Sequence, residues 1–175
     1  GFVYTSDLSP QAIGKVVEDA ISISRYTEAD SHNCLPRGNY EYPQLEVYDP
    51  EISAASLEAK IELAREMERI ALASDSRVNI IERAGYDDSE FTSVIMNTNG
   101  LYACGKGNYC GIYISLVAQE QGDAQNGFSM MVRKNYKDLD PNFTGREAAS
   151  NAVRGLNARS IGSAHMPCVM EPYVV

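Results

Sequence analysis

The sequence predicts an α+β fold, in which an antiparallel β meander is covered by helices on one face. Apolar residues recur at helical spacing in three stretches, over about residues 10–26, 53–74 and 144–156. Between the second and third stretches, residues 77–135 form shorter β-prone runs that turn residues separate. The chain has 175 residues, 44% of them apolar, which is enough for one domain with a real core.

The first predicted helix spans residues 10–26. Pro10 presets the helical φ at its first position, where a missing N–H costs nothing. An apolar stripe follows at helical spacing and consists of Ile13, Val16, Val17, Ala20 and Ile21. We expect this stripe to face the core.

The second predicted helix spans residues 53–74 and has one apolar face. This face consists of Leu57, Ile61, Ala64, Met67 or Ile70, and Ala71. The remaining positions carry charges spaced three or four residues apart, which is typical of a solvated helix face.

The third predicted helix opens with a capping box, in which Thr144 and Glu147 each satisfy the other's backbone N–H. Small residues on its apolar face, including Gly155, favour close packing on a sheet.

The β region divides into several predicted strands. They span residues 77–86, 91–98, 101–104, 109–119 and 127–135. Asn99-Gly100 predicts a hairpin with a type I′ turn, which needs positive φ at both central positions. The glycine-rich segment 105–111 is predicted to be a second hairpin turn.

Alternation along two of these strands predicts which face is buried. We expect the core face to carry Ile112, Ile114, Leu116, Phe128, Met130 and Val132. The opposite face, with Tyr113, Ser115, Ser129 and Arg133, is then left for water or a partner.

The segment 27–52 is longer than most connections within a compact domain and contains three prolines. Its tyrosines Tyr40, Tyr42 and Tyr48 have two interpretations. They are rim contacts for a peptide, or they cover an otherwise exposed sheet edge, which is the interpretation we prefer.

The charge balance excludes several classes of partner. The chain has 15 basic and 24 acidic residues, and its net charge of −9 disfavours direct binding to nucleic acid or to an anionic membrane. No apolar run approaches the ~20 residues that span a bilayer, and the chain starts without the pattern of a signal peptide. We therefore expect a cytoplasmic protein.

A search for catalytic chemistry gives no candidate. His32 and His165 lie far apart in sequence, and neither has a ligand partner at metal-binding spacing. The glycine-rich segment lacks the Gly-Lys-Ser/Thr ending and the following helix of a phosphate-binding loop. The cysteines are scattered, at Cys34, Cys104, Cys110 and Cys168, and are expected to be reduced, packed thiols. We therefore assign no catalytic, cofactor-binding or metal residue to this chain.

A short sequence pattern occurs near both ends. Residues 4–10 (Tyr-Thr-Ser-Asp-Leu-Ser-Pro) return as residues 136–141 (Tyr-Lys-Asp-Leu-Asp-Pro), and each copy leads into a predicted helix. The recurrence has two explanations, which are an internal structural duplication and the chance reuse of helix-capping residues.

These motifs and their order resemble the amino-terminal half of the TldD/PmbA family. The resemblance rests on residues 5–10 (Thr-Ser-Asp-Leu-Ser-Pro), 35–36 (Leu-Pro), 45–50 (Leu-Glu-Val-Tyr-Asp-Pro), 97–100 (Asn-Thr-Asn-Gly), 138–141 (Asp-Leu-Asp-Pro), Gly145 and 147–149 (Glu-Ala-Ala). It covers nearly the whole chain and is closer to the PmbA branch than to the TldD branch. It implies an internally duplicated α+β domain, zinc-dependent peptide cleavage and an earlier description as a modulator of DNA gyrase.

The catalytic motif of the family is not found in this sequence. In the TldD branch a His-Glu-x-x-x-His helix follows a strand similar to residues 166–172, and the PmbA branch generally lacks it. We therefore interpret residues 1–175 as the amino-terminal half of a longer protein without its carboxy-terminal domain. Zinc is expected only in a catalytic partner or in that further domain.

The resulting functional prediction is a non-catalytic domain of a PmbA-like subunit that serves assembly and peptide handling. Its expected partners are a TldD-like subunit or a second copy, with unfolded peptide as a candidate ligand. The alternative is a stand-alone acidic module that captures an extended peptide by strand addition at a sheet edge.

Overall fold

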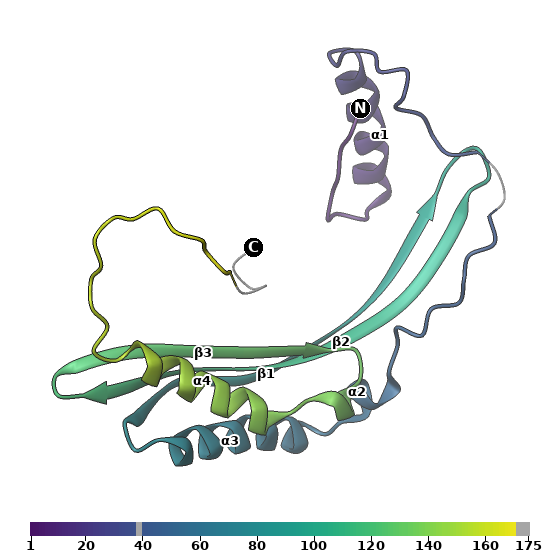
Figure 1. Ribbon diagram of the computed structural model, residues 1–175. Coiled ribbons are helices and arrows are strands. Elements are labelled where there is room, and N and C mark those ends of the chain that lie inside the picture. Colours follow the sequence, from purple (N-terminus) through teal and green to yellow (C-terminus); the bar gives the residue numbers. More distant parts are fainter. Residues whose placement is uncertain (38–39, 171–175) are drawn as a thin grey trace. The chain divides into compact units, whose positions relative to one another are not determined.

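The computed structural model describes residues 1–37 and 40–170 (Figure 1). Its elements are α1 (Pro10–Ser24), α2 (Pro50–Ala54), α3 (Leu57–Ser74), β1 (Val78–Met96), β2 (Tyr102–Glu120), β3 (Asp123–Arg133), the 3-10 helix η1 (Tyr136–Asp138) and α4 (Pro141–Gly155). The chain forms two compact units. Unit 1 contains residues 1–41 and 95–102, and unit 2 contains residues 42–94 and those from 103 onward.

Unit 2 contains most of a three-stranded antiparallel sheet with the order β1-β2-β3. Strands β2 and β3 pair in an unbroken register from Glu120↔Asp123 to Cys110↔Arg133. Helices α3 and α4 lie together on one face of this sheet (Figure 1). The predicted α+β class is confirmed, whereas the internal duplication stays a prediction.

The hairpin turn at Asn99-Gly100 differs from the predicted type. At Asn99-Gly100 only the glycine has positive φ, at 89°, and the Asn97 N–H donates to the Leu101 carbonyl at 3.0 Å. This is a three-residue loop that closes with a left-handed glycine, so the hairpin is confirmed and its type I′ turn is wrong. Type I′ signs of φ occur instead at Gln121 (51°) and Gly122 (88°), between β2 and β3.

The strands are longer and fewer than predicted. The predicted glycine-rich turn at residues 105–111 is wrong, because these residues lie inside β2. Gly107 shows why a glycine occurs there, since a Cβ at this position would lie 2.7 Å from the Phe91 ring and 3.2 Å from the Val47 carbonyl oxygen. The glycine therefore marks a close approach within a strand, not a turn.

The predicted helix 53–74 is two helices. The Asp49 carboxylate accepts from the Glu51 N–H at the start of α2, and the Ser56 hydroxyl accepts from the Ala59 N–H at the start of α3. Ala55 and Ser56 have extended backbone, which breaks the helix between the two caps.

The last helix begins before the predicted capping box. The Asp140 carboxylate accepts from the Phe143 N–H, and Pro141 is the first helical residue. Thr144 instead donates its hydroxyl to the Asp140 carbonyl, and Glu147 accepts from Ser129 on β3. The capping box is wrong, because the helix begins at Pro141 and not at Thr144. The helix start predicted at Pro10 is confirmed.

The core lies between the sheet and helices α3 and α4. It consists of Met67, Ala71, Val78, Ile112, Ile114, Leu116, Ala118, Met131, Ala148, Ala149 and Ala152. Two glycines allow this packing: a Cβ at Gly127 would lie 2.2 Å from the Ala148 carbonyl oxygen, and one at Gly145 would lie 2.8 Å from the Met67 carbonyl oxygen. The close packing predicted for the last helix is therefore correct.

In unit 1 the predicted core stripe of the first helix is wrong. Helix α1 has no buried residue, and Ile13, Val17 and Ile21 are exposed. The apolar period is sufficient to form an amphipathic helix, but it does not supply the neighbour that would cover its apolar side. In the part of the chain that the structure describes, no helix is long and apolar enough to cross a membrane.

Candidate functional site

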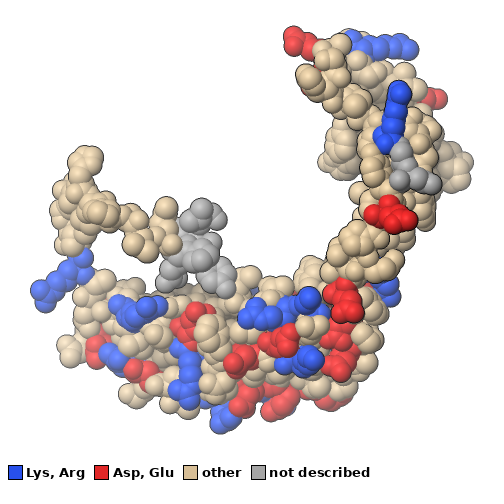
Figure 2. Space-filling model, turned by 45° about the vertical axis from the view of Figure 1, so that its right-hand side comes forward, with Lys and Arg blue, Asp and Glu red and all other residues tan. Residues whose placement is uncertain are grey.

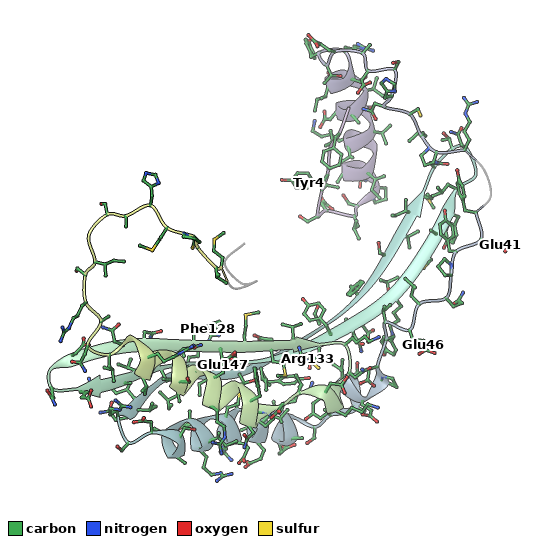
Figure 3. The ribbon with its side chains drawn as sticks, in the orientation of Figure 1. Tyr4, Glu41, Glu46, Phe128, Arg133 and Glu147 are labelled. Atoms are coloured by element: carbon green, nitrogen blue, oxygen red, sulfur yellow. The ribbon has the colours of Figure 1, made fainter. Side chains whose placement is uncertain are left out.

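The apolar residues of β3 lie on the side of the sheet that the helices do not cover. The register pairs Ile114 with Ser129 and Tyr113 with Met130, so the odd-numbered residues of β3 face the helices. Phe128 is 48% exposed, and Figure 3 labels it on the side of β3 away from α4. The prediction that Phe128, Met130 and Val132 belong to the core is therefore wrong.

Packing of α4 explains this reversal. Gly127 and Ser129 face the helix because larger side chains would not fit beneath it, and Met131 supplies the apolar contact. Ser129 is buried and donates its hydroxyl to the Glu147 carboxylate at 2.5 Å. The predicted exposure of Ser129 is wrong, and Arg133 lies at a helix-facing register position opposite Cys110. The predicted face of Tyr113 and Ser115 is confirmed.

We call the uncovered side of β2 and β3 the open face. Its central positions are Tyr109, Gly111, Tyr113, Phe128, Met130 and Val132. By contrast, the helical side of unit 2 carries interspersed acidic and basic side chains (Figure 2). Pairs such as Glu62–Arg65 and Glu66–Arg69 on α3 account for part of this charge, as expected for a solvated helix face. The two sides of unit 2 therefore differ strongly in polarity.

The Tyr113 ring is held in place by its neighbours on β1. A Cβ at Gly85 would lie 2.5 Å from the Tyr113 Cζ and hydroxyl oxygen, so the ring lies across a position where β1 has no side chain. The Arg83 guanidinium lies 5.0 Å from the centre of the ring, within the range of a cation–π contact. Tyr113 is thus a fixed aromatic surface on the open face.

A polar network lies beside the aromatic residues. The Glu82 carboxylate accepts from the Ser115 hydroxyl at 2.7 Å and from the Asn126 amide at 2.6 Å. Ile81 and Ala84 both pack against the core. The two residues that separate them, Glu82 and Arg83, contact Ser115 and Tyr113 on the open face. The strict alternation of β1 is therefore shifted by one residue at this point.

A groove of about 410 Å³ runs over the open face. Its lining is Asp87, Tyr109, Gly111, Ile112, Tyr113, Phe128, Met130, Met131 and Val132. This volume lies within the ~300–1,000 Å³ typical of ligand sites. It is the candidate binding site of unit 2, because it combines aromatic walls with a single rim carboxylate.

A second cleft, of about 560 Å³, lies between α3 and β1. Lys60 donates to the Asp88 carboxylate at 2.5 Å, and its ammonium lies 5.2 Å from the Tyr86 ring centre. The Tyr86 hydroxyl is buried and has no partner at hydrogen-bond geometry among the described residues. Its pKa is raised, mainly by burial and further by the nearby Asp88 carboxylate.

The described part of the chain has no candidate metal site. No three His, Cys, Asp or Glu side chains there form a group that could hold a metal ion. Burial raises the pKa of the Cys110 thiol to about 11, so this cysteine is a protonated core residue at neutral pH. The prediction that the cysteines are packed holds for Cys110 alone, because Cys34, Cys104 and Cys168 are exposed.

The tyrosine segment contacts β1 and β2 through Tyr48. Its hydroxyl donates to Glu90 at 3.0 Å, and the Lys106 ammonium lies 4.1 Å from its ring centre. Lys106, and then Tyr48, hold the pKa of Glu90 below its usual range. The Val47 carbonyl also accepts from the Asn108 N–H, so this part of the segment lies on β2, as the covering interpretation expects.

The comparisons with known proteins agree with this architecture. Residues 50–156 match the model of the PmbA/TldA metallopeptidase central domain. The chain is 27% identical to Metalloprotease PmbA of Escherichia coli O157:H7 and 24% identical to the Metalloprotease PmbA homolog of Haemophilus influenzae, over 97% of its own length in both cases. It spans 38% of each of these relatives.

Solved structures share the fold. A candidate modulator of DNA gyrase from Thermotoga maritima superposes with a TM-score of 0.72 at 23% identity, and one from Bacteroides thetaiotaomicron superposes with 0.76 at 20%. Each match covers 91% of this chain, and 36% and 37% of the respective solved chains. Since the family model matches more than half of the 175 residues, the chain belongs to the PmbA/TldD metallopeptidase family.

Proposed function

We propose that this chain is a non-catalytic part of a PmbA-like subunit in a zinc-dependent peptidase system, and that it serves assembly and peptide handling. In this proposal residues 1–175 are one part of a longer protein, since they span 38% of each of the two PmbA relatives. The observation that carries the proposal is the open face, an aromatic sheet surface opposite the helices.

The described residues do not fit a zinc site. Zinc is bound by three or four His, Cys, Asp or Glu side chains that converge on one point. His32 and His165 are exposed, and no suitable group of three occurs in residues 1–37 and 40–170. The proposal therefore places zinc in a catalytic partner or in the further domain.

The open face is suited to assembly because its large side chains are half-exposed. Aromatic residues at a protein surface contribute most when a partner covers them, and tyrosine is enriched among such residues. A TldD-like subunit or a second copy of this chain are the proposed assembly partners.

An association assay tests this role. Tyr113→Ala should weaken binding to a TldD-like partner at least about tenfold, as expected for a central aromatic contact. Leu72→Ala is the matched control, since Leu72 is an exposed apolar residue on α3. Equal affinity of both variants and the unmodified chain would show that the open face is not the assembly surface.

The alternative is a stand-alone acidic module that binds an extended peptide at a sheet edge. The position of β1 at the edge of the sheet, beside the cleft against α3, favours it. The codons that follow Val175 discriminate between the two functions. A further large domain supports the subunit, whereas a stop codon supports the stand-alone module.

A further inference from the structure

The centre of the groove is a gap in a row of side chains. Tyr109, Gly111 and Tyr113 alternate along the same side of β2, so Gly111 leaves a hollow between two aromatic walls. The Val132 side chain forms the floor of this hollow, since a Cβ at Gly111 would lie 3.4 Å from Val132 Cγ2. The two tyrosines are four residues apart, which places their Cα atoms about 13 Å from each other at a strand rise of ~3.3 Å per residue. Val132 lies directly opposite Gly111 on β3, and Met130 lies opposite Tyr113. The hollow therefore has apolar walls on two strands.

The rim of this hollow carries one unpaired charge. Asp87 lines the groove and makes no ion pair or hydrogen bond within the described residues. The other charged groups on this side of β1 are already engaged, since Glu82 binds Ser115 and Asn126 and Arg83 covers Tyr113. The net charge of −9 also favours a cation at this rim.

We infer that the groove binds an extended peptide that places a bulky apolar side chain over Gly111 and a lysine or arginine side chain beside Asp87. This inference rests on the proposed function, because it names the ligand of the open face. The fixed Tyr113 ring supports it, since a wall that is already ordered loses little conformational entropy when a ligand binds. Both tyrosine hydroxyls are also available to the polar backbone of a peptide.

Binding of labelled ten-residue peptides by the whole chain, followed by fluorescence anisotropy, tests the inference. The probes share a Gly/Ser background and carry Phe-Lys, Phe-Glu or Ser-Lys at the centre. Phe-Lys should bind most tightly. Phe-Glu should bind about two- to fivefold more weakly, the effect of an exposed ion pair, and Ser-Lys at least about tenfold more weakly.

Charge reversal gives the sharpest result. Asp87→Lys should reverse the preference, so that Phe-Glu binds more tightly than Phe-Lys. Asp88→Asn is a control for the loss of a neighbouring charge, because Asp88 is the next residue and carries the same charge, but pairs with Lys60 and does not line the groove. An unchanged preference in Asp87→Lys, or an equal loss of preference in Asp88→Asn, would overturn the role of Asp87.

Filling the hollow tests the apolar site. Gly111→Ala should reduce the advantage of Phe-Lys over Ser-Lys. Its Cβ would lie 3.2 Å from the Met131 carbonyl oxygen, so urea denaturation of the variant checks that β2 and β3 stay paired. Gly105→Ala is the control on the same strand, since a Cβ at Gly105 meets no atom within 4 Å. Equal peptide affinity in the two variants would overturn the site at Gly111. If no peptide binds but Tyr113→Ala still weakens partner association, the peptide inference fails and the proposed assembly role stands.

Discussion

The two faces of the β2–β3 pair have similar apolar character but different surroundings. Ile112, Ile114 and Leu116 lie beneath the helices and are at most 1% exposed. On the opposite side, Phe128, Met130 and Val132 are at least 41% exposed although they alternate just as regularly. Alternation therefore shows that a strand has an apolar face, but the helix that packs on the sheet determines which face is buried.

The largest effect expected is on the covered face. Leu116→Ala should lower the free energy of unfolding by about 2–5 kcal/mol, because it removes buried methyl groups and leaves a cavity. Urea denaturation of Leu116→Ala and Tyr113→Ala measures the contrast. A larger loss of stability in Tyr113→Ala would show that the two faces of β2 have been assigned the wrong way round.

A comparison of a buried and an exposed residue of β3 tests which side of this strand faces α4. Met131→Ala should cost about 2–5 kcal/mol because Met131 is buried, whereas Val132→Ala should cost less than about 1 kcal/mol because half of that side chain is already in water. Thermal and urea denaturation of the two variants provide the measurement. Equal losses would mean that β3 does not keep one fixed face toward α4.

A smaller effect is expected where α4 meets β3. Gly127→Ala should destabilise by about 1–3 kcal/mol, since the new Cβ would lie 2.2 Å from a backbone oxygen of α4 and force the helix outward. Gly105→Ala serves as the control, because it adds the same methyl group to β2 in open space. A neutral Gly127→Ala variant would contradict the close packing of α4.

The smallest expected effect is a pH dependence of stability, which arises from Asp75 and Arg77 just before β1. Hydrogen bonds from Arg77 lower the pKa of Asp75 from its ordinary 3.8 to about 2. Because the folded pKa is the lower one, the stabilisation by Asp75 is complete above pH ~4 and is lost as the pH falls toward 2. The difference in stability between the unmodified chain and Asp75→Asn should therefore shrink over this interval. A difference that is constant from pH 5 to 2 would exclude this ion pair as its source.

Local sequence rules predict most of the secondary structure. The start at Pro10, the hairpin at Asn99-Gly100 and the alternation of β2 all depend on residues within a few positions of one another. The break between α2 and α3 was missed because Ala55 is a good helix former, and only the cap at Ser56 marks the new start.

The candidate site was harder to predict because it depends on residues from different elements. The exposed face of β3 follows from the space that Gly127 leaves for α4 and from the Ser129–Glu147 hydrogen bond, which joins residues 18 positions apart. One local signal did exist for the groove. Gly111 interrupts the side-chain row of a strongly alternating strand, and such a glycine often marks close approach by a ligand or another backbone.

The tight turn at Gln121-Gly122 has a consequence for the folding of the sheet. It sets the pairing Glu120↔Asp123 and hence every later pair between β2 and β3. A slip of one residue would exchange the two sides of β3 and bring Phe128, Met130 and Val132 under α4. Such a state would bury these three apolar side chains. It would also place Phe128 at the position of Gly127, where even a Cβ would lie 2.2 Å from the Ala148 carbonyl oxygen of α4. Two residues at the hairpin tip thus hold the register that keeps Phe128, Met130 and Val132 on the open face.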